Sequence, residues 1–194
     1  MKRIGILGGV FDPVHFGHLS IAELAKSSFN LEQVVFVPAG IAPHKQAVST
    51  PAPERLEMLK LALADLPYFG IWEGEVNKNG CAYTVDTISE LIGVYPDARL
   101  YFIIGADNLA EIHTWHYSNE ILNKVTLCVA GRPGFHIDPP EALSNADIEI
   151  FNGPQWGLSS TILRKYLKSG LSCKFLAPDT VLAYIRENGL YGYS

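Results

Sequence analysis

The chain has 194 residues, of which 48% are hydrophobic and 18% are charged, and its formal net charge is −5. This length suits one α/β domain, the composition excludes a disordered chain, and no apolar run reaches the roughly 18 residues that a membrane-spanning helix needs. The acidic balance argues against a general nucleic-acid surface, which carries a basic stripe. We therefore expect a globular protein that binds neither nucleic acid nor membrane. It is expected to be a monomer or a homodimer.

The cysteines and the N-terminal residues give information on the cellular compartment in which the protein is expected. Cys81, Cys128 and Cys173 are odd in number and widely spaced, which argues against a disulfide framework and against a zinc site. They are expected to be ordinary thiols. Met1 to Arg3 lead directly into an apolar strand, so we expect no removable signal peptide and a cytoplasmic location.

The first element is an apolar run, Ile4 to Leu7, which predicts a buried strand, and the string GGVFDPVHFGH follows it over residues 8–18. Residues 19–25 then have apolar positions at helical spacing. Glycines let the backbone approach a ligand closely, and a helix start offers unpaired N–H groups and the positive end of a dipole. A strand, a glycine turn and a helix in this order predict a phosphate-binding site.

His15 and His18 are expected at the mouth of this site. A neutral imidazole can bind a metal, a protonated one can donate to phosphate oxygens or stabilise charge in a transition state, and a histidine can also be structural. The spacing is not the helical His-Glu-x-x-His arrangement of zinc sites, and Asp12 is the only carboxylate in the loop. These features favour phosphate chemistry, with no metal held by the protein.

The loop matches neither Gly-x-x-x-x-Gly-Lys-Ser/Thr nor Gly-x-Gly-x-x-Gly. It resembles the signature of the nucleotidylyltransferase superfamily, a Gly-Gly-Ser/Thr-Phe-Asp-Pro loop followed by His-x-Gly-His. The resemblance implies that His15 and His18 contact the triphosphate of ATP, with His18 steadying the α-phosphate under attack. Val10 stands where many members have a hydroxyl residue. The resemblance further implies that ATP is bound by the loop residues Gly8, Gly9, Val10, Phe11 and Gly17.

A second buried strand is expected over residues 33–38, and an intervening helix predicts that it is parallel to the first. Lys45 lies in the loop that follows, on the side of a doubly wound sheet where ligands bind. A lone lysine on a long loop is most often only solvated. The string Pro43-His44-Lys45, however, resembles a loop of the nicotinate-nucleotide branch of the superfamily, which implies that Lys45 lies beside the ATP phosphates.

A helix is expected over residues 53–63 and a strand over residues 68–72. Thr84 is able to cap the next helix, residues 85–94. The Tyr-Thr-x-x-Thr pattern that begins at Tyr83 also resembles the segment with which bacterial nicotinate-nucleotide adenylyltransferases hold the pyridine carboxylate through N–H groups at a helix start. An anion is physically favoured there.

The next expected strand, residues 99–104, ends in Gly-Ala-Asp, and Trp115 follows a short helix. On its own, Asp107 could be a helix N-cap and Trp115 a core residue. The same family has Gly-Ala-Asp followed by a tryptophan, which implies that Asp107 borders the mononucleotide and that Trp115 stacks on the nicotinate ring. An aromatic platform suits a pyridinium. His113 and His116 are treated as surface or packing residues.

Two further strands are expected over residues 125–130 and 148–151. Between them, Arg132 follows a strand end in a Gly-Arg-Pro-Gly turn. The sequence leaves open whether it contacts phosphate or is a solvated turn residue.

The last motif is LSSTILR over residues 158–164. It can be read simply as a well-capped helix start, but hydroxyls, free N–H groups and a guanidinium together also form an anion cradle. It resembles the second superfamily signature, Ile-Ser-Ser-Thr-x-x-Arg, which implies that Ser159, Ser160 and Thr161 bind ATP and that Arg164 acts in catalysis. A final helix over residues 178–189 is expected to be a packing element.

Strands that alternate with helices predict a doubly wound parallel α/β sheet of Rossmann type. We expect a single domain, residues 1–194, with residues 155–194 as its C-terminal helical part. The resemblance implies the nucleotidylyltransferase fold and the joining of ATP to nicotinate mononucleotide, with release of pyrophosphate, in NAD synthesis. The alternatives are another acceptor, nicotinamide mononucleotide or phosphopantetheine, or a nucleotide-binding module without turnover.

The chain shows no obvious nucleophile paired with a base, so the substrate phosphate is expected to attack ATP directly. Catalysis would then consist of positioning and charge stabilisation, with Mg²⁺ carried by ATP. The residues expected to supply it are His15, His18, Lys45 and Arg164.

Overall fold

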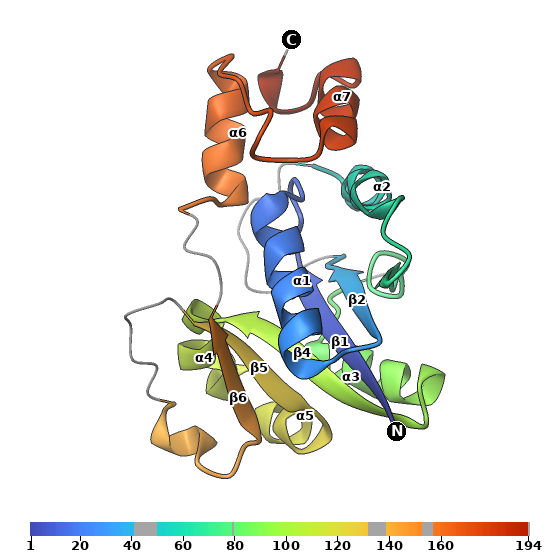
Figure 1. The fold of residues 1–194 in the computed structure, drawn as a ribbon, viewed down its shortest axis with the longest axis vertical. Coiled ribbons are helices and arrows are strands. Elements are labelled where there is room, and N and C mark those ends of the chain that lie inside the picture. Colours follow the sequence, from blue (N-terminus) through green and yellow to red (C-terminus); the bar gives the residue numbers. More distant parts are fainter. Residues whose placement is uncertain (41–49, 79, 132–138, 153–156, 194) are drawn as a thin grey trace.

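The computed structural model describes residues 1–40, 50–78, 80–131, 139–152 and 157–193 (Figure 1). Within them, six strands form one sheet in the order β3-β2-β1-β4-β5-β6, and every neighbouring pair is parallel. The predicted doubly wound α/β fold is therefore confirmed. The strands are β1 (Lys2–Gly9), β2 (Gln33–Pro38), β3 (Phe69–Ile71), β4 (Ala98–Gly105), β5 (Thr126–Gly131) and β6 (Ile148–Asn152).

Helices connect these strands and follow the last of them. The α-helices are α1 (Phe16–Phe29), α2 (Ala52–Leu63), α3 (Thr84–Val94), α4 (Ala106–Glu111), α5 (Ser118–Lys124), α6 (Ser160–Lys168) and α7 (Asp179–Glu187). Short 3₁₀ turns are η1 (Ile112–Thr114), η2 (Glu141–Leu143) and η3 (Leu190–Gly192).

Two apolar clusters, one on each face of the sheet, make the core. Successive residues of a strand point to opposite faces, so Ile6 of β1 belongs to one cluster and Leu7 to the other. The Leu7 cluster takes buried residues from α1, α2, α6 and α7, whereas the Ile6 cluster takes them from α3, α4 and α5. Both faces are thus covered by helices, which explains why the strands read as continuous apolar runs.

The C-terminal helices lie beyond the start of α1 (Figure 1). Leu163 of α6 is fully buried in the same cluster as Leu7. The backbone N–H of Phe16 donates to the carbonyl of Leu176 at 3.0 Å, and Thr180 Oγ1 donates to the carbonyl of Leu61 at 3.1 Å. The C-terminal segment therefore packs on both α1 and α2, and α7 is the packing element expected from the sequence.

Element boundaries differ from the expected ones by a few residues. The strand expected over 68–72 is only Phe69–Ile71, because it lies at the edge of the sheet and pairs with β2 alone. Thr84 was expected to cap a helix, but it is the first residue of α3, and the N-cap is Tyr83, with no side-chain cap bond. Asp107 is likewise inside α4, whose N-cap is Gly105.

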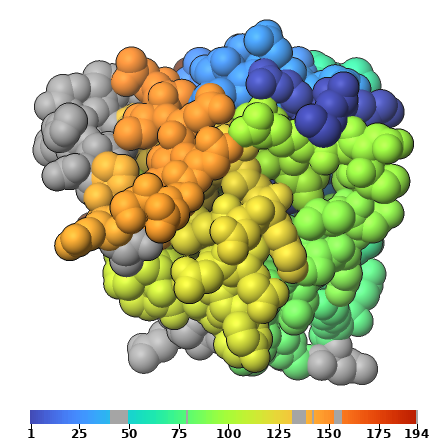
Figure 2. All heavy atoms as spheres, turned by 90° about the horizontal axis from the view of Figure 1, so that it is seen from below, coloured from blue at the N-terminus to red at the C-terminus, as the bar shows by residue number. Residues whose placement is uncertain are grey.

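Figure 2 views the molecule from below, where the N-terminus, α3 and α5 reach the surface. This is the end at which β1 begins (Figure 1). In the described part of the chain, no helix is both long enough and apolar enough to cross a bilayer. Residues 8–15, here called the glycine loop, end β1 and lead into α1 at the opposite end of the sheet. That end of the sheet is therefore where the functional site is expected.

Replacing Leu163 with alanine tests whether α6 is part of the main core. The side chain is fully buried, so the loss of its contacts and the resulting cavity are expected to lower the free energy of unfolding by about 2–5 kcal/mol. Urea unfolding followed by tryptophan fluorescence measures this change. Leu171→Ala is the control, since Leu171 is 51% exposed. A separate early transition for the C-terminal segment would contradict a shared core.

Candidate functional site

The first signature forms the connection from β1 to α1. Phe11 has a φ of 52°, in the left-handed region, and its side chain is 1% exposed. A Cβ at Gly9 would lie 2.9 Å from the Phe11 ring, so glycine is required for this ring to pack against the strand end. The Phe11 ring meets the His18 ring edge-on, with 5.0 Å between centroids. The buried phenylalanine therefore supports a histidine of the same signature.

His15 and His18 cap the start of α1 reciprocally. His15 Nδ1 accepts a hydrogen bond from Gly17 N at 3.1 Å, and His18 Nδ1 accepts one from His15 N at 3.3 Å. This is a capping box in which imidazole nitrogens replace the usual hydroxyl and carboxyl oxygens. The two rings stack with 3.8 Å between centroids. When neutral, each ring carries its proton on Nε2, because Nδ1 is an acceptor.

His15 is the inner member of this pair. It is 4% exposed, and burial lowers its pKa from 6.5 to about 4, against a smaller raising effect of a backbone hydrogen bond. The ring is therefore uncharged near neutral pH. A Cβ at Gly17 would lie 2.9 Å from it, so the glycine of the signature makes room for the imidazole.

The second signature docks on the first. Ser159 Oγ caps α6 by accepting from Ile162 N at 3.3 Å. Ser160 Oγ donates to the carbonyl of Pro13 at 3.0 Å, and Arg164 donates through one guanidinium nitrogen to the carbonyl of Asp12 at 2.6 Å. The two motifs, about 150 residues apart in sequence, are thus one structural unit.

Arg55 of α2 binds the glycine loop from the other side. At 1% exposure, its guanidinium donates to the carbonyls of Val10 at 2.6 Å, Ala39 at 2.7 Å and Thr50 at 3.1 Å. Burial lowers its pKa, and the charge of Asp12 acts in the opposite direction. Arginine remains charged in proteins, so this is a buried cation satisfied by backbone carbonyls.

A cavity of about 490 Å³ opens where the two signatures meet. It combines the glycine loop with an imidazole, hydroxyls and a guanidinium, which are donors suited to phosphate oxygens. Its lining includes Gly8, Gly9, Val10, Phe11, Asp12, His18, Asn108, Ser160, Thr161 and Arg164.

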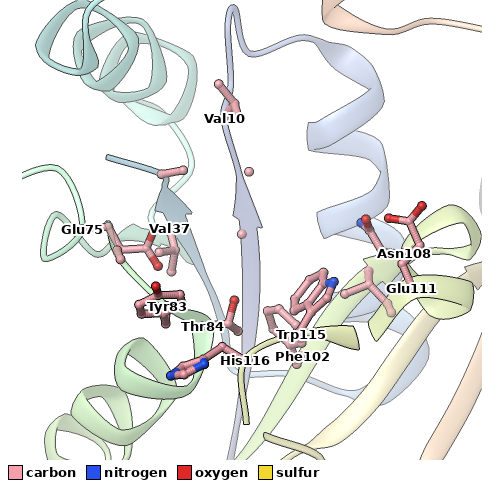
Figure 3. Close-up of a pocket in the computed structure, with 15 residues that line it drawn as sticks. Val10, Val37, Glu75, Tyr83, Thr84, Phe102, Asn108, Glu111, Trp115 and His116 are labelled. Carbon is pink, nitrogen blue, oxygen red and sulfur yellow. The ribbon is translucent and has the colours of Figure 1, made fainter. Parts of the chain in front are cut away.

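A second cavity, of about 270 Å³, lies beside the first and has an aromatic wall (Figure 3). Tyr83 and Thr84 stand on one side and Trp115 on the other. The His116 ring lies 4.4 Å from that of Tyr83, and Trp115 meets Phe102 edge-on at 6.2 Å. This cavity suits a flat ring and adjoins the start of α3, where N–H groups favour an anion.

Two carboxyl groups, Glu75 and Glu111, also line the second cavity. Glu75 Oε1 accepts a hydrogen bond from Thr87 Oγ1 at 2.6 Å. Burial raises the pKa of Glu75, and the bond from Thr87 opposes that rise. The wall of this cavity therefore combines aromatic rings with carboxyl groups, and aromatic faces favour a cationic ring.

Both cavities lie at the carboxyl ends of β1 and β4, which are neighbours in the sheet. The chain leaves β1 toward α1 on one face and β4 toward α4 on the other. In open α/β sheets this reversal of direction is where ligands bind. Gly8, Gly9 and Val10 line both cavities, so two ligands could meet across the glycine loop.

Sequence comparison identifies the family. A model of the cytidylyltransferase-like family matches residues 6–166. A protein of Desulfitobacterium hafniense named "Probable nicotinate-nucleotide adenylyltransferase" is 42% identical over 201 residues, covering 98% of this chain and 96% of that protein. A protein of Oceanobacillus iheyensis with the same name is 40% identical over 193 residues, covering 100% and 98%. The chain belongs to the nicotinate-nucleotide adenylyltransferase family.

Solved structures agree on the fold of this family member. Plasmodium falciparum nicotinic acid mononucleotide adenylyltransferase complexed with NaAD superposes with a TM-score of 0.81 at 20% identity, covering 100% of this chain and 99% of that one. The same enzyme complexed with APC gives a TM-score of 0.79 at 19% identity. At this level of identity the likeness concerns the fold.

Most residues predicted for the site come together in this adenylyltransferase-family chain. The glycine loop, His18, Ser160, Thr161 and Arg164 line the first cavity, and Tyr83, Thr84 and Trp115 line the second. Buried His15 and Gly17 form the base of the helix cap, and Ser159 is the cap of α6. Lys45 lies outside the described residues, as do His44 and Arg132.

Asp107 does not line either of these two cavities. It is exposed on α4, and its neighbours Asn108 and Glu111 face the site instead. Positions three apart on a helix share a face, so this pair was the available sequence signal. His116, expected from the sequence to be a surface or packing residue, lines the second cavity beside Tyr83.

In the described residues, no group of three or more His, Cys, Asp or Glu side chains is placed to hold a metal ion. The donors around the first cavity are hydroxyls, N–H groups and a guanidinium. They suit the oxygens of a bound nucleotide rather than a bare cation.

The buried neutral state of His15 predicts a pH-dependent stability. The unfolded chain takes up this proton near pH 6.5 and the folded chain only near pH 4. Between those values the unfolded state binds more protons, so the free energy of unfolding should fall on acidification by about 3 kcal/mol from this group. Urea unfolding at a series of pH values from 7 to 4 measures it.

The control for this prediction is His15→Asn, which keeps an acceptor at the N-cap without titrating in this range. Its pH dependence should be shallower than that of the unsubstituted chain. Equal slopes for the two proteins would show that His15 is not the group responsible.

Proposed function

We propose that this protein transfers the adenylyl group of ATP to nicotinate mononucleotide, giving nicotinate adenine dinucleotide and pyrophosphate, as a step of NAD synthesis. The observation that carries the proposal is the pair of adjoining cavities at the crossover of the sheet, one lined by phosphate donors and one by aromatic rings. The names of the relatives support the same reaction.

The reaction needs no covalent intermediate with the protein. An oxygen of the mononucleotide phosphate attacks the α-phosphorus of ATP, a new P–O–P linkage forms, and the bond from the α-phosphorus to the bridging oxygen breaks. The electron pair leaves with pyrophosphate. The protein then contributes alignment of the two phosphates and stabilisation of the charge that moves onto the leaving group.

We assign these tasks to the described residues of the first cavity. His18 Nε2 would donate to the α-phosphate, because Nδ1 is already engaged as a cap acceptor. Arg164 and Thr161 would hold the leaving phosphates, and the N–H groups at the start of α6 favour the same negative charge. Lys45 remains a predicted phosphate contact.

For His15 we propose a supporting role. Its Nδ1 is engaged with Gly17 N, and its ring stacks beneath that of His18. The direct phosphate contact expected for it is less favoured, since it is buried and does not line the first cavity. His15 would affect the reaction indirectly, by keeping the His18 ring in its orientation.

In the second cavity, the pyridinium ring would stack on Trp115, with its carboxylate directed to the N–H groups near Thr84 at the start of α3. The aromatic and acidic wall would favour the positive ring. We propose Mg²⁺–ATP as the form of ATP that binds, with the cation carried on the phosphate oxygens.

The chain is proposed to act as one domain, with residues 155–194 as its C-terminal helical part, because a single apolar cluster runs from Leu7 to Ile185. We propose nucleotides rather than nucleic acid or membrane as its partners, in view of the net charge of −5. Its three cysteines are free thiols, which fits a reducing cytoplasm.

Acceptor choice tests the proposal directly. Pyrophosphate release is measured with ATP and magnesium in three parallel reactions, containing nicotinate mononucleotide, nicotinamide mononucleotide or phosphopantetheine. We expect the nicotinate compound to give the highest kcat/KM, because among the three acceptors it alone carries a ring carboxylate for the N–H groups at the start of α3. Preference for another acceptor would overturn the assignment of the second cavity. Nucleotide binding without any release would favour a module that lacks turnover.

His18 is expected to contribute most to the chemical step. His18→Ala should lower kcat by about two or more orders of magnitude, the scale of losing a donor to transition-state charge. His18→Gln separates chemistry from folding, since glutamine can still accept the bond from His15 N in the capping box. Both variants should be impaired in steady-state assays, His18→Gln the less so, because its amide N–H can still donate to a phosphate oxygen.

His113→Ala is the matched control, because His113 is an exposed histidine of η1 outside both cavities. It should keep the unsubstituted rate. Near-normal turnover of His18→Ala would contradict the role given to His18.

A further inference from the structure

The carboxylate of Asp12 is the buried negative charge of the glycine loop, and it is held from the far end of the sequence. Asp12 is 3% exposed. Its Oδ1 accepts a hydrogen bond of 2.6 Å from the hydroxyl of Tyr191, which lies 179 positions later in η3. A bond to a charged acceptor inside the protein is stronger than one at the surface.

Tyr191 is placed for this contact at a backbone cost. Its φ is 58°, in the left-handed region that non-glycine residues avoid, and its neighbours in the turn, Gly189 and Gly192, have φ values of 61° and 69°. Its half-buried side chain packs against the apolar cluster that includes Leu7. Burial and the bond to Asp12 raise the pKa of the hydroxyl, so it remains a donor at neutral pH.

Asp12 in turn contacts the guanidinium of the second signature. Arg164 donates to the Asp12 carbonyl at 2.6 Å, and the same nitrogen lies 3.8 Å from Oδ2. Both Asp12 and Arg164 line the first cavity, whereas Tyr191 does not. The 2.6 Å hydrogen bond to Asp12 therefore connects the Tyr191 hydroxyl to a residue that lines the cavity.

The glycine loop is thus bound from three elements. Arg55 of α2 holds the Val10 carbonyl, Arg164 of α6 holds the Asp12 carbonyl, and Tyr191 of η3 holds the Asp12 carboxylate. Of these three hydrogen bonds, the one from Tyr191 is made to a side chain, whereas the other two are made to backbone carbonyls. Loss of the Tyr191 hydroxyl removes the 2.6 Å hydrogen bond to the Asp12 carboxylate, which favours a closer approach of Oδ2 to Arg164 and competition with phosphate for the guanidinium.

We propose that Tyr191 is a positioning residue of the ATP site, which orients the Asp12 carboxylate so that Arg164 stays available to the phosphates. This inference rests on the proposed function for the identity of the nucleotide. It concerns the first cavity only and predicts no effect on the second.

The test compares Tyr191→Phe with Tyr193→Phe. Each removes one hydroxyl from the same turn region, but the Tyr193 hydroxyl accepts from exposed Arg186 at 2.9 Å, away from the loop. The equilibrium Kd for Mg²⁺–ATP is measured by calorimetry without acceptor, together with the Kd for nicotinate mononucleotide and the melting temperature. We expect Tyr191→Phe to weaken ATP binding about tenfold, the scale of one bond to a charged group, and to leave mononucleotide binding unchanged.

Asp12→Asn provides a second, independent arm. If Tyr191 acts through the Asp12 carboxylate, adding Tyr191→Phe to Asp12→Asn should weaken ATP binding no further. Additive losses would overturn the inference, as would unaltered ATP binding in Tyr191→Phe. An equal loss for both ligands with a lower melting temperature would show a purely structural role. Because ATP binding is measured without an acceptor, a wrong acceptor assignment does not affect this result.

Discussion

The arrangement of the site depends on a buried cation. Arg55 has lost its hydration at 1% exposure, a cost that its hydrogen bonds to the carbonyls of Val10, Ala39 and Thr50 offset. Val10 lies in the connection from β1 to α1, and Ala39 and Thr50 lie at the two ends of the connection from β2 to α2, so one side chain fixes two connections at the carboxyl edge of the sheet. The glycine loop can then present its other side to a ligand without collapsing onto the strand ends.

Patterns that are local in sequence could be predicted well. The strands are continuous apolar runs because both faces of the sheet are covered, and the connection of β1 to α1 has its own glycine and histidine signature. Residues 8–18 and 158–164 each show a helix start with anion-binding groups, and their resemblance to the two family signatures assigned them to one site. The hydrogen bond from Ser160 to the Pro13 carbonyl shows that these two segments are in contact in the folded chain.

Contacts that depend on the folded arrangement could not be predicted. Nothing local distinguishes Arg55 from an exposed helix residue, and no spacing rule joins Asp12 to Tyr191. Asp107 and Asn108 are neighbours on α4, and one position along a helix turns the side chain by about 100° around the helix axis. Asn108 therefore lines the cavities and Asp107 does not, a difference that the sequence motif alone does not show. His116 was missed because its role depends on the ring of Tyr83, which comes from a different element.

The wall common to the two cavities has a thermodynamic consequence. Gly8, Gly9 and Val10 line both, as do Ile104 and Asn108. A ligand that displaced these shared residues would alter the shape of the other cavity and so link the two binding equilibria. Linkage is reciprocal: whatever factor the first ligand applies to the affinity of the second, the second applies to the first. A coupling carried by these shared residues would therefore have the same size in both directions, whichever ligand binds first.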